Sequence, residues 1–370
     1  MTPATVLGMA TALPRGRIAQ SVAADFAARR CCEDTAQAEW LHRRYARSGV
    51  EQRGCVLVGE DGAIEPLRAF YPEPTSGNGR GPGTQRRLAR FEQEAPALAR
   101  QAAEAAMRDA EVRPDQITRI VTASCTGLMS PGVDMHLIEQ LGLCPTVGRT
   151  NLGFMGCHAA FNALQVAHSL AAGEPGAKVL VVCVELCTLH FHYGWDKEKI
   201  VANALFGDGA AAAVLEAGEA ADAAGRWRLR ATASHLLPDC PEAMTWRIGD
   251  HGFEMTLSPL VPRLIKPHLT GWLSQWLAGQ GVSVEQVRSW ALHAGGPKIL
   301  ETVCGAFGLS VEAAAVSRDV LAECGNMSST TILFILDRLR REAKPGPCVA
   351  MGFGPGLVME TALLEMSDAE

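Results

Sequence analysis

The sequence lacks an excess of positive charge. Lys and Arg together number 34 against 40 Asp and Glu, and the formal net charge is −6 at pH 7. A protein that binds nucleic acid or an anionic membrane through phosphate groups needs a basic surface, which this composition does not supply. We therefore expect no nucleic acid among its partners.

Long hydrophobic runs are missing as well. One of the longest, residues 179–184, falls far short of the roughly 20 apolar residues that a helix needs to cross a bilayer. Residues 1–10 lack the basic start and the long apolar centre of an export signal. We expect neither a membrane span nor export.

Cysteines and apolar residues, by contrast, are plentiful. The 12 cysteines are scattered, mostly within apolar stretches, where a reduced thiol acts as a small hydrophobic side chain. This usage favours a reducing compartment and predicts a cytoplasmic location. With 370 residues, of which 48% are hydrophobic, the chain is long enough to bury about 75% of its unfolded surface, which excludes a disordered chain and a small disulfide-stabilised protein.

The order of predicted elements repeats once along the chain. In each copy a strand and its loop precede an apolar helix and a second strand, at residues 117–127, 156–170 and 178–185, and again at residues 289–296, 325–339 and 347–356. Between the copies 169 residues separate Ser124 from His293 and Cys157 from Asn326, and 170 separate Val179 from Val349. A constant offset over three elements predicts two similar α/β halves, residues 1–220 and 221–370, related by a pseudo-two-fold axis.

The helix that we predict from Cys157 onward is apolar on almost every side. Asn162 and Gln165 are its main polar interruptions, so other elements must cover it all round. We expect it between two sheets, in a duplicated five-layer αβαβα stack.

Three chemically capable residues occupy matching places in this duplicated frame. Cys157 stands at the predicted start of the first apolar helix, Asn326 precedes the equivalent helix, and His293 ends a short apolar strand. Taken singly, Cys157 fits a buried structural thiol and His293 a core histidine, but the shared register favours one cavity that holds all three. We expect the helix start and an imidazolium to favour the Cys157 thiolate, and N–H groups of His293 and Asn326 to stabilise an enolate or an oxyanion.

Five motifs resemble the type III polyketide synthases, the chalcone and stilbene synthase group. They are GCHAAFNAL at 156–164, ALFGDGAAAAV at 204–214, LHAGGPKIL at 292–300, ECGNMSSTTILFILD at 323–337 and GFGPG at 352–356. The resemblance implies a thiolase fold, a homodimer, and repeated extension of an acyl-CoA starter with malonyl-CoA, without a metal or redox cofactor. It also implies that Cys157 carries the growing chain while His293 and Asn326 promote decarboxylation of the malonyl group.

The resemblance further implies which residues line the substrate cavity. Phe206 matches the aromatic gatekeeper between the coenzyme A tunnel and the cavity. Met255 stands where the plant enzymes place a second gatekeeper phenylalanine. Cys125, Thr126 and His190 stand where the plant cavity is lined with Thr or Ser. These departures argue against a phenylpropanoid starter and favour an alkyl one.

The glycine-rich motif and one nearby loop also match positions of the family. The resemblance places Gly352, Phe353 and Gly354 against the cavity wall as scaffold, where we expect the glycines to allow positive φ in a tight turn. In the plant enzymes a Met of one subunit reaches the partner's cavity, and here Ser130 occupies that position.

Three basic residues are candidates for contacts with coenzyme A. Arg43 and Arg47 lie four positions apart, on one face of a predicted helix, and match the family's basic helix. Lys298 follows the GGP of the motif LHAGGPKIL at 292–300. Charged donors at a tunnel mouth suit phosphates, although a solvated surface is the alternative interpretation.

Other interpretations remain open at this stage. The spacing of Cys183, Cys187, His190 and His192 could suggest a metal site, but Cys183 ends a buried strand and we expect no metal. A ketosynthase III that condenses once with acyl carrier protein shares the three central residues. A non-catalytic acyl-binding paralogue would keep the cavity alone.

Overall fold

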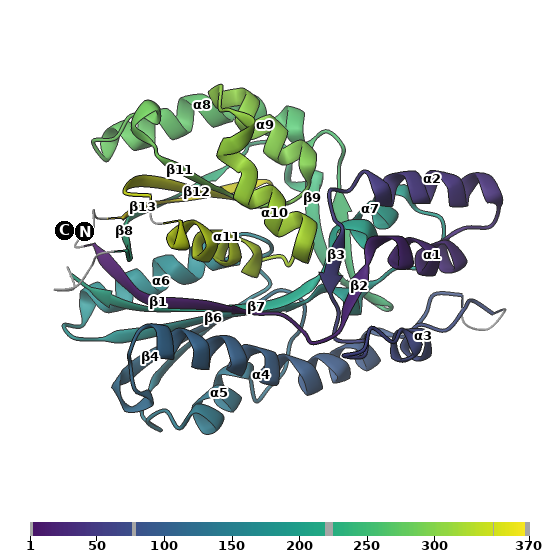
Figure 1. The fold of residues 1–370 in the computed structure, drawn as a ribbon, viewed down its shortest axis with the longest axis horizontal. Coiled ribbons are helices and arrows are strands. Elements are labelled where there is room, and N and C mark those ends of the chain that lie inside the picture. The colour runs from purple at the N-terminus through teal and green to yellow at the C-terminus, as the bar shows by residue number, and fades with distance from the viewer. Residues whose placement is uncertain (1–2, 76–78, 219–224, 343, 367–370) are drawn as a thin grey trace.

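Strands from both halves of the chain join in one sheet of nine strands in the computed structural model, which describes residues 3–75, 79–218, 225–342 and 344–366 (Figure 1). The strand order is β11-β12-β13-β8-β1-β7-β6-β4-β5. The first half supplies β1 (Ala4–Ala12), β4 (Ile117–Ser124), β5 (Gly148–Gly153), β6 (Lys178–Leu186) and β7 (Asp208–Ala217). The second half supplies β8 (Trp227–Leu236), β11 (Ser289–Leu292), β12 (Gly346–Gly354) and β13 (Val358–Met366).

The two halves of the sheet repeat one pairing pattern. In the first half, β4 pairs with β6 in parallel, and β6, β7 and β1 then pair antiparallel. In the second half, β11 pairs with β12 in parallel, and β12, β13 and β8 pair antiparallel. Among the described residues two pairs, Ala4 with Leu229 and Thr5 with Arg228, join the halves through β1 and β8. The predicted duplication is confirmed, while its boundary between residues 220 and 221 lies outside the described residues.

Helices pack inside and outside the two sheet halves (Figure 1). The outer helices are α4 (Thr84–Asp109) and α5 (Val133–Leu141) on one side, and α8 (Val261–Gly279) and α9 (Pro297–Phe307) on the other. Between the sheet halves lie α6 (Ala159–Gly173) and α11 (Thr330–Arg341). This is the expected five-layer α/β stack.

Strand β6 shows why the layers form. Its residues alternate between two cores: Val179, Val181 and Cys183 face the inner helices, and Leu180, Val182 and Val184 face α4. A strand buried on both faces reads as an unbroken apolar run, as residues 179–184 do.

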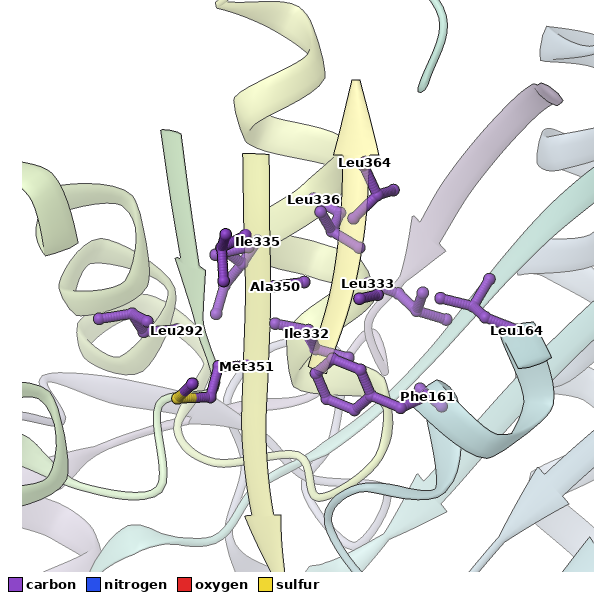
Figure 2. Packing of buried hydrophobic residues seen from close by; sticks show 14 of the residues in the cluster. Phe161, Leu164, Leu292, Ile332, Leu333, Ile335, Leu336, Ala350, Met351 and Leu364 are labelled. Atoms are coloured by element: carbon purple, nitrogen blue, oxygen red, sulfur yellow. The ribbon is translucent and has the colours of Figure 1, made fainter. Parts of the chain in front are cut away.

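The two inner helices are the most deeply buried elements. Residues 330–337 of α11 are all buried, and Figure 2 shows Phe161 and Leu164 of α6 near Ile332 and Leu333 of α11, beside β12 and β13. Helix α6 begins at Ala159 and not at Cys157. The prediction of a helix start at Cys157 was wrong by two residues, because Gly156 has a φ of 88° and a tight turn precedes the helix.

The remaining elements gather at the end of the molecule opposite both termini (Figure 1). They include β2 (Arg17–Ala19), α1 (Gln20–Cys31), α2 (Thr35–Ala46), β3 (Gln52–Gly54), α3 (Glu65–Phe70), α7 (Lys197–Leu205), β9 (Met244–Gly249) and β10 (Gly252–Leu257), while α10 (Ala315–Cys324) packs beside α11. The parallel strands β4, β6, β11 and β12 end towards this cap, so the loops that follow them meet where α/β sheets usually bind ligands. No helix of the described ranges is long and apolar enough to span a bilayer.

Truncation of an inner leucine should cost far more stability than truncation of an exposed one. Leu333 of α11 is 1% exposed and Leu236 is 65% exposed. We expect Leu333→Ala to lower the free energy of unfolding by about 2–5 kcal/mol, because it leaves a cavity between the layers. Leu236→Ala should change it by less than about 0.5 kcal/mol. Urea denaturation followed by circular dichroism measures both, and similar losses would contradict the layered core.

Candidate active site

Two connected compartments lie between the sheet ends and the cap. The outer one has a volume of about 560 Å³ and opens towards α2 and α9, and the inner one holds about 90 Å³. Cys157, His293 and Asn326 all line the outer compartment. The duplicated frame therefore brings a thiol, an imidazole and a carboxamide from both halves to one cavity.

Backbone contacts hold His293 and Asn326 in place. His293 follows β11, and its N–H donates to the carbonyl oxygen of Met351 in β12 at 2.8 Å. Asn326 lies four residues before α11 and bridges to Phe206: its N–H donates to Leu205 O at 2.8 Å, and Gly207 N–H donates to Asn326 O at 2.9 Å. The backbone at Asn326 of one half is thus paired with the segment that follows α7 in the other half.

Phe206 and Met255 lie between the compartments. Both residues, together with Cys157, line the outer and the inner space. Phe206 follows the last residue of α7 and Met255 belongs to β10. This position is the one that the two gatekeeper predictions require.

Burial dominates the ionisation of Cys157. The thiol is buried, and burial raises its pKa to about 11 even though hydrogen bonds with Ser328 and Asn326 lower it. Ser328 Oγ lies 3.6 Å from Cys157 Sγ. The nearby helix start is worth roughly 1 kcal/mol or less, which does not offset removal of a thiolate from water.

Burial also disfavours a charged His293. Burial, followed by the proximity of His158, lowers its pKa to about 4, so it carries no positive charge at pH 7. Among the described residues its Nδ1 has no hydrogen-bond partner. Burial of both groups therefore opposes the expected thiolate–imidazolium pair and favours a thiol beside a neutral imidazole.

The inner compartment has a rigid wall that includes His190. His190 Nδ1 accepts from Phe253 N–H at 2.9 Å, so Nε2 must donate to Thr126 O at 2.7 Å. The ring stacks on Phe253 with centroids 4.3 Å apart, and Trp246 lies edge-on to both rings. Burial lowers the pKa of His190 to about 3, and with both nitrogens engaged this side chain shapes the cavity and transfers no proton.

Cys125 and Thr126 line the same compartment but use their polar atoms for support. Gly156 N–H donates to Cys125 Sγ at 2.9 Å, which holds the peptide that precedes Cys157. Thr126 Oγ1 donates to Glu185 at 2.7 Å and accepts from Leu186 N–H at 2.9 Å. Burial raises the pKa of the Glu185 carboxyl, which hydrogen bonds lower in part.

The GFGPG motif forms the expected tight turn at its last glycine, while its first two glycines make room for close packing. Gly352 and Gly354 lie in β12, and the positive φ of 78° belongs to Gly356. A Cβ on Gly352 would lie 2.7 Å from Phe161, and one on Gly354 would lie 2.0 Å from His158. The two glycines are thus required for close packing of α6 and the preceding turn on β12, while Phe353 alone of the three predicted residues lines the outer compartment.

The mouth of the outer compartment is basic. Arg47 and Lys298 line it as expected, and Arg44 and Lys197 join them. Arg43 does not: it pairs with Glu39 at 3.6 Å with its side chain 58% exposed. Neighbours on a helix point about 100° apart, and Arg44, next to Arg43, is the residue that lines this opening.

Some lining residues escaped the sequence analysis. Trp40 borders the mouth, with the Arg44 guanidinium 4.8 Å and the Lys197 ammonium 5.8 Å from its ring centroid. Ser328, with a φ of 50°, lies two residues after Asn326 in the GNMSS segment. This closeness to a candidate catalytic residue was the sequence signal that could have identified it. Trp246 had none, because only the tertiary fold brings its hairpin to the cavity.

Two further expectations concern Ser130 and metal binding. Ser130 is exposed and lines neither compartment of this single chain. Cys183 faces the inner core, and His190 has both ring nitrogens engaged. In the described parts of the chain no three His, Cys, Asp or Glu side chains gather as a metal site.

Comparison with protein families gives two adjoining matches. Residues 1–219 match the N-terminal domain of chalcone and stilbene synthases, and residues 228–367 match the C-terminal domain. The alpha-pyrone synthesis polyketide synthase-like Pks18 of Mycobacterium tuberculosis is 33% identical over 99% of this chain and 92% of its own length. A 1,3,6,8-tetrahydroxynaphthalene synthase of Streptomyces peucetius is 32% identical over 97% of this chain and 92% of its own.

Solved structures agree with these matches. The crystal structure of PKS-I from the brown alga Ectocarpus siliculosus has a TM-score of 0.90 at 30% identity and covers 99% of both chains. The type III polyketide synthase domain of Steely1 from Dictyostelium has a TM-score of 0.87 at 26% identity, covering 98% of this chain and 99% of that domain.

The raised thiol pKa predicts how alkylation depends on pH. Because the thiolate is the reactive form, iodoacetamide modification of Cys157 should accelerate by about tenfold per pH unit between pH 7 and 9. Mass spectrometry of the Cys157 peptide follows the rate, in a Cys144→Ser background that removes an exposed thiol. A rate that is already constant at pH 7 would show a preformed thiolate and contradict the neutral pair.

Proposed function

Because the chain belongs to the chalcone and stilbene synthase family, we propose that it is a type III polyketide synthase that extends an acyl-CoA starter with several malonyl units. The observation that carries the proposal is the convergence of Cys157, His293 and Asn326 on one cavity. A nucleophile and two N–H donors are the groups that decarboxylative Claisen condensation requires.

The proposed reaction assigns one role to each group. Cys157 sulfur attacks the starter thioester, its proton passes to the neutral imidazole, and coenzyme A leaves with a proton. Loss of CO₂ from malonyl-CoA then gives an enolate, whose oxygen accepts hydrogen bonds from His293 and Asn326. The enolate carbon attacks the acyl group on Cys157, and the sulfur departs as the new carbon–carbon bond forms. Repetition gives a poly-β-keto chain that cyclises to a pyrone, resorcinol or phloroglucinol type product.

A neutral His293 suits this assignment. An imidazole with its pKa lowered to about 4 donates a hydrogen bond at neutral pH without already being charged. It can also accept the thiol proton, which an imidazolium cannot. Desolvation thus keeps the ring in the neutral form that both roles require, while the lowered pKa makes it a weaker base.

The basic mouth supports binding of coenzyme A. Arg44, Arg47, Lys197 and Lys298 line the same opening, and guanidinium and ammonium groups are the usual partners of phosphates. Trp40 offers a flat apolar surface between two of these cations. Arg43 has no place in this proposal.

The inner compartment supports an alkyl starter. Its wall is mainly apolar, and it reaches from Cys157 past Met255 to Phe26 and Leu67. An apolar chain gains by leaving water for such a space. The relative described as an alpha-pyrone synthesis polyketide synthase makes a pyrone our first choice of product.

The remaining parts of the proposal concern partners and location. The reaction uses coenzyme A thioesters and needs no further cofactor. A homodimer is supported by the open edge of β5, beside which Leu128 and Met155 are 45% and 38% exposed. All 12 cysteines are free, which fits the reducing cytoplasm.

Replacement of the nucleophile tests the proposed function. Wild-type enzyme given malonyl-CoA and a panel of acyl-CoAs should form polyketides detectable by mass spectrometry, whereas Cys157→Ala should neither load acyl groups nor condense them. Cys144→Ala removes an exposed thiol and should behave as wild type. Persistent condensation by Cys157→Ala would refute the nucleophile, a single condensation that requires acyl carrier protein would indicate a ketosynthase III, and an unreactive Cys157 would indicate a binding protein.

Filling the far end of the inner compartment should shorten the preferred starter. Ala23 in α1 lines it, and its neighbour Val22 is 37% exposed. We expect Ala23→Phe to lower kcat/KM for long-chain acyl-CoA at least tenfold relative to short-chain acyl-CoA, since the ring occupies space for the distal methylenes. Val22→Phe is the matched control. Unchanged chain-length selectivity in Ala23→Phe would refute the alkyl-binding role.

A further inference from the structure

A polar chain leads from the surface to the residue next to Cys157. His158 Nδ1 lies 2.9 Å from Asn162 Oδ1, Asn162 Nδ2 donates to Glu360 Oε1 at 3.3 Å, and Ser234 Oγ donates to the same oxygen at 2.6 Å. His158 and Glu360 are 3% and 4% exposed. Because the Asn162 amide turns its N–H to Glu360, its oxygen faces His158, and Nδ1 of His158 carries the proton.

These hydrogen-bonded side chains cross the boundary between the two halves. His158 and Asn162 belong to the start of α6, whereas Ser234 and Glu360 are cross-strand neighbours in β8 and β13. Glu360 is also directly opposite Gly352 in β12. The hydrogen bonds among these side chains therefore connect the segment that carries Cys157 to the strands of the other half.

The same strands position His293. Its N–H binds Met351 O next to Gly352 at 2.8 Å, and a Cβ on Gly352 would lie 3.4 Å from His293 Cβ. Among the described residues no hydrogen bond fixes His293 Nδ1. The position of the imidazole relative to Cys157 thus depends on how α6 and its preceding turn are seated on β12.

Phe161 packs against Gly352, but the row of alanines on α6 defines that seating poorly by itself. The face of α6 buried in the core carries Ala159, Ala163, Ala167 and Ala171, all fully buried and spaced by four. Equivalent methyl groups at a regular spacing give similar contacts when a helix shifts by one turn. A buried polar chain permits only the register in which each donor meets its acceptor.

We propose that His158, held through Asn162 by Glu360, is a positioning residue that sets the Cys157 thiol in register with His293. The proposal rests on the proposed function, since it explains how the same site is aligned. The proximity of His158 also contributes, after burial, to the lowered pKa of His293.

The alignment can be tested by separating the half-reactions. Malonyl-CoA decarboxylation requires His293 and Asn326 alone, whereas loading passes the Cys157 proton to His293, so loading and condensation both require the two groups in register. We expect Asn162→Leu and His158→Phe to keep decarboxylation within about threefold of wild type, while the loading rate and kcat for condensation fall at least tenfold and KM for the starter is unchanged. A misplacement of about 1 Å can cost about a hundredfold in rate.

Two matched variants complete the test. Gln165 lies on the exposed side of α6, so Gln165→Leu should leave all three rates unchanged. Glu360→Gln keeps an oxygen that can accept from Asn162 and Ser234 and should retain condensation within about threefold.

The outcomes distinguish this proposal from the proposed function. Equal losses in all three reactions, or loading and condensation that fall no further than decarboxylation, would overturn the positioning role. If His158→Phe fails to fold, Asn162→Leu carries the same comparison. Failure of the proposed function would instead appear in the wild-type enzyme, which would neither load acyl groups nor release CO₂.

Discussion

The need to cover two inner helices on both sides governs this structure. Helices α6 and α11 have too little polar surface to face water, so a sheet half lies over each side and further helices cover the outside. The segments that precede both helices then meet at one end of the layers. Cys157 and Asn326 precede these helices, and the short strand β11 delivers His293 to the same place.

The same burial sets the electrostatic character of the site. Removal from water raises the pKa of Cys157 and lowers that of His293, which leaves both groups neutral before substrate arrives. In a site of this kind charge develops only during the reaction. The negative charge that forms on the enolate oxygen is then stabilised by hydrogen-bond donors that are already oriented. The aromatic wall formed by His190, Phe253 and Trp246 adds shape without adding charge.

Much of this arrangement could be predicted from the sequence because periodicity and spacing record burial directly. The constant offset between Cys157 and Asn326 located the duplicated frame, and the unbroken apolar run at 179–184 reported a strand covered on both faces. The predictions from sequence failed where tertiary contacts determine which side chain faces the cavity or how a buried group ionises. Arg43 and Arg44 are equivalent by composition, and only the packing of α2 shows which one faces the cavity. The expected thiolate neglected desolvation, and Gly352 and Gly354 serve a close approach that no local turn signal reveals.

Convergence of groups from the two halves is the central claim, and chemical cross-linking tests it most directly. The short bifunctional reagent 1,3-dibromoacetone bridges a thiol and an imidazole that lie side by side. The structure predicts one cross-linked peptide pair that joins Cys157 to His293, absent from the Cys157→Ala variant and suppressed by acyl-CoA. A reagent that modifies Cys157 but never bridges to His293, or that links it to another part of the chain, would contradict the account.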